Sequence, residues 1–178
     1  MKKFKIEIKW GIIFALITLL WMWLEKSMGL HSENIDKHAT LTNIFAVPAI
    51  LVYVLALLDK RKRYYHDTMS WAQGFTSGLI ITVIVTVLTP VNHYIIHTYI
   101  SPEYFENAIQ FAVDSGKMTI QEAENYFNLQ SYILQSLLGA VVMGVVTSAI
   151  VAIFVRRSKK KKDEKSYRYR RLCRIKIY

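Results

Sequence analysis

The chain has 178 residues, of which 53% are hydrophobic, and its formal net charge is +10 at pH 7. Its long uncharged stretches exclude an ordinary water-soluble domain, because buried core helices are usually shorter than the roughly 20 apolar residues that cross a bilayer. The surplus positive charge lies in the two termini and in one short cluster, where it orients membrane proteins, so it does not indicate nucleic-acid binding.

Four uncharged apolar stretches predict an all-α, polytopic membrane protein with four transmembrane helices. The first stretch has tryptophan near both ends, as expected where a helix crosses the two membrane interfaces. The second contains Pro48 near its middle and the third contains Pro90, and a missing backbone N–H predicts a bend at each. We place the spans at about 8–28, 39–58, 74–100 and 133–155.

The segment between the third and fourth spans, 101–131, predicts two short helices rather than an irregular loop. Ser101 followed by Pro102 is a typical start for the first helix. Thr119 and Glu122 have the spacing of a capping box, which predicts the start of the second helix. Because acidic residues outnumber the single lysine here, we expect an acidic helical hairpin.

The charges between the spans alternate in sign along the chain. The N-terminal segment, the gap 59–73 and the C-terminal segment are net positive, whereas the gaps 25–38 and 101–132 are net negative. Positively charged segments tend to stay in the cytoplasm. We therefore predict that both termini are cytoplasmic and that the helical hairpin is external.

Basic residues beside the predicted inner leaflet are expected to contact anionic lipid headgroups. The segment 158–178 has many basic and few apolar residues, so we predict a basic cytoplasmic tail that is disordered or associated with the lipid surface. The expected membrane-surface residues are Lys60, Arg61, Lys62, Arg63, Arg156, Arg157, Lys159, Lys160, Lys161 and Lys162.

Small residues recur at every fourth position of the fourth span and at the start of the third. Small side chains let helix backbones approach closely in a membrane. We expect a close seam between these two helices, with a dimer face as the alternative, and a protein partner or a homo-oligomer stays possible. The predicted packing residues are Gly74, Gly78, Ser136, Ala140, Gly144, Ser148 and Ala152.

No catalytic motif is present: the chain lacks GxSxG, a Walker loop, GxGxxG and CxxC. We therefore predict that the protein is not an enzyme and needs no cofactor or metal. His93 and His97 lie four residues apart on one helix face and are weak candidates for metal ligands, without the glutamate of HExxH. The candidates for a third ligand are His31, His38, Glu33 and Asp36.

Two functions from different classes are open at this point. The first is a non-enzymatic scaffold or accessory subunit of a membrane complex. The second is a small transporter or channel-like protein, although transport pathways usually place a carboxylate inside the membrane. A polar cavity would favour transport, and a solid interior packed with Gly and Ala would favour the scaffold. The only polar track along a span is Thr82, Thr86, Thr89 and His93.

Three sequence elements resemble a known family. They are the Trp-Gly-Ile-Ile of Trp10–Ile13, the Leu58–Lys62 loop followed by Ser70–Gly78, and the Thr-x-x-Glu-Ala-Glu that begins at Thr119 before a small-residue fourth span. Together they are similar to the uncharacterised four-helix bacterial membrane proteins of domain-of-unknown-function family 4199. The resemblance covers about residues 1–157 and implies an inner-membrane location. That family has no assigned activity, so the resemblance implies no site residues.

Overall fold

The computed structural model of the protein describes residues 4–158. Its regular elements in this part of the chain are helices, and four of them are long and apolar enough to cross a membrane. The prediction of an all-α protein with four membrane-length helices is therefore confirmed. These helices are α1 (Lys5–Ser27), the continuous segment formed by α2 (Ile35–Leu41), η2 (Thr42–Phe45) and α3 (Ala46–Arg63), α4 (Trp71–Ile95) extended by the π-helical turn η3 (Ile96–Ile100), and α7 (Leu129–Val155).

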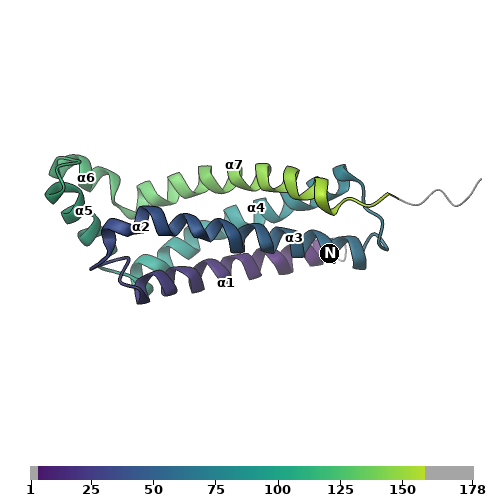
Figure 1. The fold of residues 1–178 in the computed structure, drawn as a ribbon, viewed down its shortest axis with the longest axis horizontal. Helices are drawn as coiled ribbons and strands as arrows, with labels where there is room; N and C mark the ends of the chain where they lie inside the picture. The colour runs from purple at the N-terminus through teal and green to yellow at the C-terminus, as the bar shows by residue number, and fades with distance from the viewer. Residues whose placement is uncertain (1–3, 159–178) are drawn as a thin grey trace, which may run out of the picture.

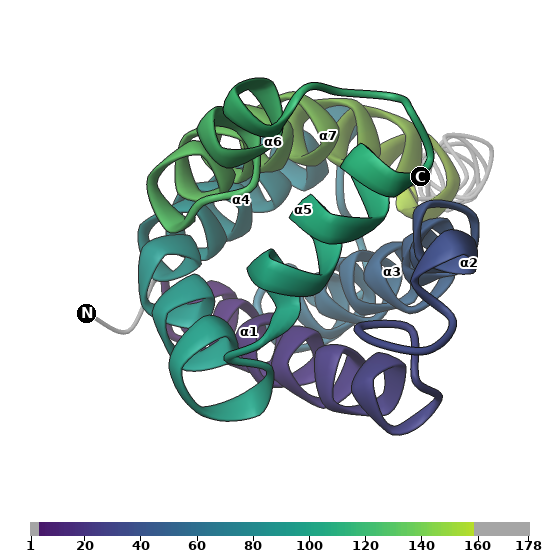
Figure 2. The same ribbon diagram turned by 90° about the vertical axis from the view of Figure 1, so that its left-hand side faces the viewer.

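The four long helices lie side by side along the length of the molecule (Figure 1). Around the bundle the order is α1, α4, α7 and α3, and each helix packs against the next. The short helices α5 (Tyr104–Asp114) and α6 (Ile120–Tyr126) gather at one end, which we name the hairpin end. Seen from that end, α5 crosses over the bundle (Figure 2). We name the opposite end, where α1 begins and α7 finishes, the tail end.

The tightest packing in the bundle joins α4 and α7. Small residues make this possible, because their short side chains let the two helix backbones approach closely. A β-carbon added to any of the three glycines would clash with the residue opposite or press tightly against it. The facing pairs are Gly74 and Ala152, Gly78 and Ser148, and Gly144 and Thr82. The predicted packing residues Ser136 and Ala140 lie nearer the hairpin end and line a pocket instead.

The main hydrophobic core lies in the tail half of the bundle. Met69, in the connection between α3 and α4, is 1% exposed and belongs to it. The backbones of Met69 and Arg157 exchange two hydrogen bonds of 2.9 and 2.8 Å, which tie the end of α7 to this connection. The core consists of Tyr53, Ala56, Leu57, Met69, Ile81, Val151, Ala152 and Val155.

Two predicted helix features differ in the structure. Pro48 falls in the first turn of α3, where its missing N–H interrupts no interior hydrogen bond of that helix, and the departure from α-helix in this span lies just before it, at the 3-10 turn η2. Ser101 does not cap the first hairpin helix: Glu103 holds the position before α5, and the Ser101 hydroxyl contacts His31 instead. The capping box of Thr119 and Glu122 at the start of α6 is confirmed, with both of its bonds formed.

Candidate functional site

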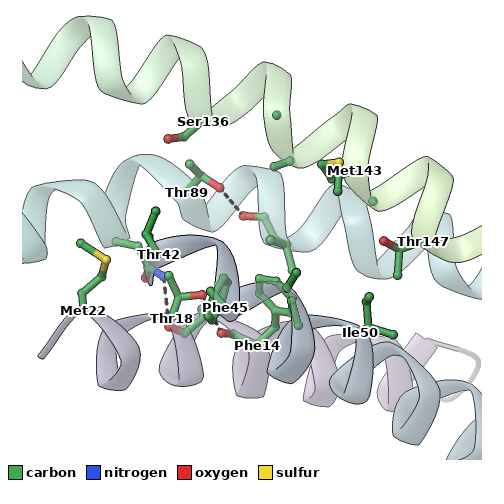
Figure 3. A pocket seen from close by; sticks show the side chains of 18 of the residues that line it. Phe14, Thr18, Met22, Thr42, Phe45, Ile50, Thr89, Ser136, Met143 and Thr147 are labelled. Atoms are coloured by element: carbon green, nitrogen blue, oxygen red, sulfur yellow. Dashed lines mark hydrogen bonds between the residues drawn. The ribbon is translucent and has the colours of Figure 1, made fainter. Parts of the chain in front are cut away.

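A pocket of about 440 Å³ lies between α1, α3, α4 and α7. Its walls are mostly apolar, and Figure 3 shows Phe14, Phe45, Ile50 and Met143 among the side chains around it. On one side, between α3 and α7, its lining residues Ile50 and Met143 are exposed, at 48% and 59%. This side of the pocket therefore faces the surroundings of the bundle, which are lipid for a membrane-spanning protein.

The polar side chains in the pocket are largely engaged with their own or neighbouring backbone. Thr18 and Thr89 donate to the carbonyl oxygens four residues earlier, each at 3.0 Å. The amide nitrogen of Asn92 donates to the carbonyl oxygen of Ala15 at 3.0 Å. Within the described residues, the buried Nδ1 of His93 has no hydrogen-bond partner. The pocket therefore offers a mainly apolar surface.

The pocket is closed towards the tail end. Tyr53, which lines it, shares a 2.8 Å hydrogen bond with the hydroxyl of Thr82, and both side chains are buried. Thr82 also donates to the carbonyl oxygen of Gly78 at 3.0 Å. Beyond this pair lies the hydrophobic core, so the pocket is confined to the hairpin half of the bundle.

The threonine and histidine track predicted along the third span is not one continuous surface. Thr89 and His93 line the pocket, whereas Thr82 belongs to the seam between α4 and α7. Thr86 does not line the pocket, and its hydroxyl is a buried atom with no hydrogen-bond partner in the described part of the chain. The track therefore does not form a polar path through the bundle.

His93 and His97, the weak metal candidates, stack on each other with ring centroids 5.7 Å apart. His97 also stacks on Phe105 at 4.1 Å, so its faces are covered by rings. Among the described residues, neither His93 nor His97 belongs to the group of side chains whose ligand atoms lie close enough together to hold a metal ion. The structure instead places His31 and His38 with Glu25.

Glu25 is the residue that sequence reasoning missed. It lies in the last turns of α1 and is fully buried. Trp21, one turn earlier, donates its indole N–H to Oε1 at 2.6 Å. The other oxygen, Oε2, lies 3.5 Å from Nε2 of His31 and 3.4 Å from Nε2 of His38. The available signal was the Trp21–Glu25 spacing, because these two side chains share a face of a helix.

Hydroxyl groups from the neighbouring elements surround the two histidines. Nδ1 of His31 lies 2.9 Å from the hydroxyl of Ser101, and Nδ1 of His38 lies 3.5 Å from that of Tyr104. Tyr104 shares a 3.0 Å hydrogen bond with Tyr132 at the start of α7. Burial is the main reason that the pKa of Tyr104 is raised, so its hydroxyl keeps its proton.

The predicted membrane-surface residues do not all reach the surface. The expectation is wrong for Lys60, which is 3% exposed because it pairs with Glu7 inside the bundle. Arg61 donates to the carbonyl oxygen of Val155 at 2.8 Å and is half-buried. Lys159, Lys160, Lys161 and Lys162, with the rest of the predicted tail, lie outside the described residues. The exposed members are Lys62, Arg63, Arg156 and Arg157.

Comparison with known proteins reveals the family but no characterised relative. No curated protein and no solved structure matches the chain. One family model, described as "Protein of unknown function (DUF4199)", matches residues 9–157. This range contains every residue that lines the pocket, and also Glu25, His31 and His38. Since the match covers most of the sequence, the chain belongs to the DUF4199 family.

Proposed function

We propose that the protein is a non-enzymatic membrane subunit that holds one lipid-like, amphipathic molecule in the pocket between α1, α3, α4 and α7. The observation that carries this proposal is the pocket itself: mainly apolar, open on the side between α3 and α7, and closed towards the tail end by Tyr53 and Thr82. An apolar chain would enter from the bilayer and fill the pocket. A small polar head would remain near Asn92 and His93, towards the hairpin end of the pocket.

Binding is favoured over transport by what lines the pocket. Among the described residues, no Asp, Glu, Lys or Arg side chain lines it. Transport pathways through membranes usually carry such groups. The solid seam between α4 and α7 lies where a path to the tail end would have to pass. These features support a holding or accessory role, and they are the reason that the transporter is the second choice.

The same proposal includes an orientation in the bacterial inner membrane. Exposed Lys62, Arg63, Arg156 and Arg157 gather at the tail end, and positive charge of this kind is typical of the cytoplasmic side. The hairpin end then faces outwards, and the pocket opens within the outer leaflet. Its ligand would therefore be drawn from outer-leaflet lipids.

Saturable binding of a fluorescent single-chain fatty acid to the detergent-purified protein tests the pocket. Gly139 lines it, and nothing lies within 4 Å of a β-carbon added there. Gly139→Phe should therefore add a bulky ring at the pocket wall without a clash and weaken binding at least tenfold. Leu138→Phe is the matched control, because Leu138 is 63% exposed and does not line the pocket. Equal loss in both variants, or no saturable binding by the unmodified protein, would contradict the proposal.

A further inference from the structure

We propose that Glu25, His31 and His38 bind one Zn²⁺ ion at the hairpin end. Two imidazole nitrogens and one carboxylate oxygen form a donor set that zinc accepts, with a fourth position left for water or another ligand. These three side chains are the one group within the described residues whose ligand atoms all lie within 4.8 Å of one another. The proposal replaces the sequence-based expectation of no metal, and it does not depend on the pocket.

The distances suit a shared ion better than direct hydrogen bonds. The Oε2 atom of Glu25 lies 3.5 and 3.4 Å from the two Nε2 atoms, both beyond the usual N–H···O range. Zinc bonds of about 2.0–2.1 Å in tetrahedral geometry separate neighbouring ligand atoms by roughly 3.3–3.4 Å. With all three ligand atoms within 4.8 Å of one another, an ion between Oε2 and the two nitrogens can reach all three.

The three atoms that face each other make no hydrogen bond of ordinary geometry. Oε2 of Glu25 and both Nε2 atoms are buried and make no hydrogen bond within the described part of the chain. Glu25 and His31 are almost fully buried, at 0% and 3% exposure. Polar atoms that are buried without hydrogen-bond partners destabilise the folded state. One cation would satisfy all three and would offset the buried carboxylate charge.

The groups behind the ligands hold them in the orientation that a metal requires. Trp21 holds Oε1 of Glu25, which leaves Oε2 directed at the histidines. A metal on Nε2 leaves the proton on Nδ1, and in His31 that N–H would donate to the hydroxyl of Ser101 at 2.9 Å. Metal-binding histidines almost always have such a second hydrogen bond. The amide of Asn107 further fixes this loop by donating to the carbonyl oxygen of His31 at 2.9 Å.

The site would join parts of the chain that are otherwise loosely connected. Glu25 belongs to α1, His31 to the connection that follows, and His38 to α2. Ser101 and Tyr104 bring in the end of η3 and the start of α5. Bound Zn²⁺ would therefore stabilise the hairpin end as a unit. Its effect would be on the local order of this end rather than on the seam at the tail end.

Metal binding to the detergent-purified full chain tests the proposal. After chelator treatment and removal of the chelator, Zn²⁺ should bind with a stoichiometry of about one per chain, measured by calorimetry and elemental analysis. Co²⁺ should give the visible absorption of a four-coordinate site. Raising the Zn²⁺ concentration should raise the melting temperature, because the ion binds only the folded state.

The decisive variant is His38→Gln, because the side chain of His38 is 17% exposed and the change is the least disruptive in the site. It should weaken Zn²⁺ binding at least 100-fold. His97→Gln is the matched control, since His97 lies at the same end but outside the group. Loss of binding in His97→Gln with normal binding in His38→Gln would overturn the assignment, as would binding of Fe²⁺ without Zn²⁺.

A second measurement removes the dependence on folded variants. X-ray absorption of the Zn²⁺-loaded unmodified protein should show a first shell of nitrogen and oxygen near 2.0–2.1 Å. The outer shells should contain the scattering of two imidazole rings. A shell without imidazole, or no Zn²⁺ bound after reconstitution, would overturn the proposal even if every variant failed to fold.

Discussion

Glu7 and Lys60 form an ion pair inside the bundle, with Oε1 and Nζ 2.7 Å apart and the two side chains 1% and 3% exposed. The pair joins the first turns of α1 to the last turn of α3. The ammonium group of Lys60 also lies 4.0 Å from the ring centre of Tyr64. A buried charge without its partner is strongly destabilising, because it loses water and gains nothing in return.

Replacing Lys60 by Met should therefore destabilise the protein by about 3–5 kcal/mol, since Glu7 would remain buried without its partner. Thermal unfolding in detergent would measure the change. The control is the double variant Glu7→Leu with Lys60→Met, which removes both charges and should recover most of the loss. Equal destabilisation in the single and double variants would show that packing, rather than charge, makes Lys60 important.

Gly144→Ala should destabilise the bundle by about 1–3 kcal/mol, because overfilling a close contact forces the helices apart. The added β-carbon would overlap the side chain of Thr82 across the seam between α4 and α7. Gly139→Ala on the same helix meets nothing within 4 Å and should be neutral or slightly stabilising. Equal melting temperatures for the two variants would contradict the close seam.

The capping box of α6 predicts a pH dependence confined to the hairpin. The backbone N–H and the hydroxyl of Thr119 lower the pKa of Glu122 from its ordinary value of 4.5. Because the folded-state pKa is the lower one, the ionised carboxylate stabilises α6 above pH 4.5, and this stabilisation is lost as the pH falls through the folded-state value.

Amide hydrogen exchange would measure this effect. Protection of the first turn of α6, relative to that of α7, should stay constant above pH 4.5 and fall as the pH is lowered through the folded-state pKa of Glu122, which lies below 4.5. Glu122→Gln keeps an acceptor for the capping bond but cannot titrate, so its protection should not change as the pH falls. The same pH dependence in both proteins would exclude Glu122 as its source.

The orientation of the protein is tested by reporter fusions. Fusions after Lys62 and after Arg157 should read as cytoplasmic, because exposed basic residues gather at these positions. A fusion between Ser115 and Lys117, in the connection between α5 and α6, should read as external. An external signal after Lys62 would reverse the proposed orientation and place the pocket in the inner leaflet.

Much of the fold could be predicted because it depends on local properties of the chain. A long uncharged apolar stretch forms a helix in a membrane whatever its neighbours are, since the backbone must satisfy its own hydrogen bonds. The capping box at Thr119 spans only four residues, so it too was visible in the sequence. The position of Pro48 in the first turn of α3 was not predicted, because it depends on where α3 begins, and the turn at Thr42–Phe45 moves that start.

The candidate site could be predicted only in part. His31 and His38 were named as candidate ligands, but together with His93 and His97, which lie outside the group of Glu25, His31 and His38. Glu25 was counted among the charges between the spans, since a single acid at the end of an apolar stretch is most often exposed. The Trp21–Glu25 spacing indicates only that these two side chains share a helix face, whereas the burial of Glu25 depends on how the hairpin end closes over α1.

The sequence by itself determined the helical class, the four membrane-length helices and the small-residue faces, because these follow from hydropathy and from spacing within single helices. Only the tertiary structure decided which residues meet. Lys60 pairs with Glu7 across 53 positions, and His31 contacts Ser101 across 70. Such contacts depend on the order and register in which the helices pack, as does the pocket between them, and neither is encoded within any one helix.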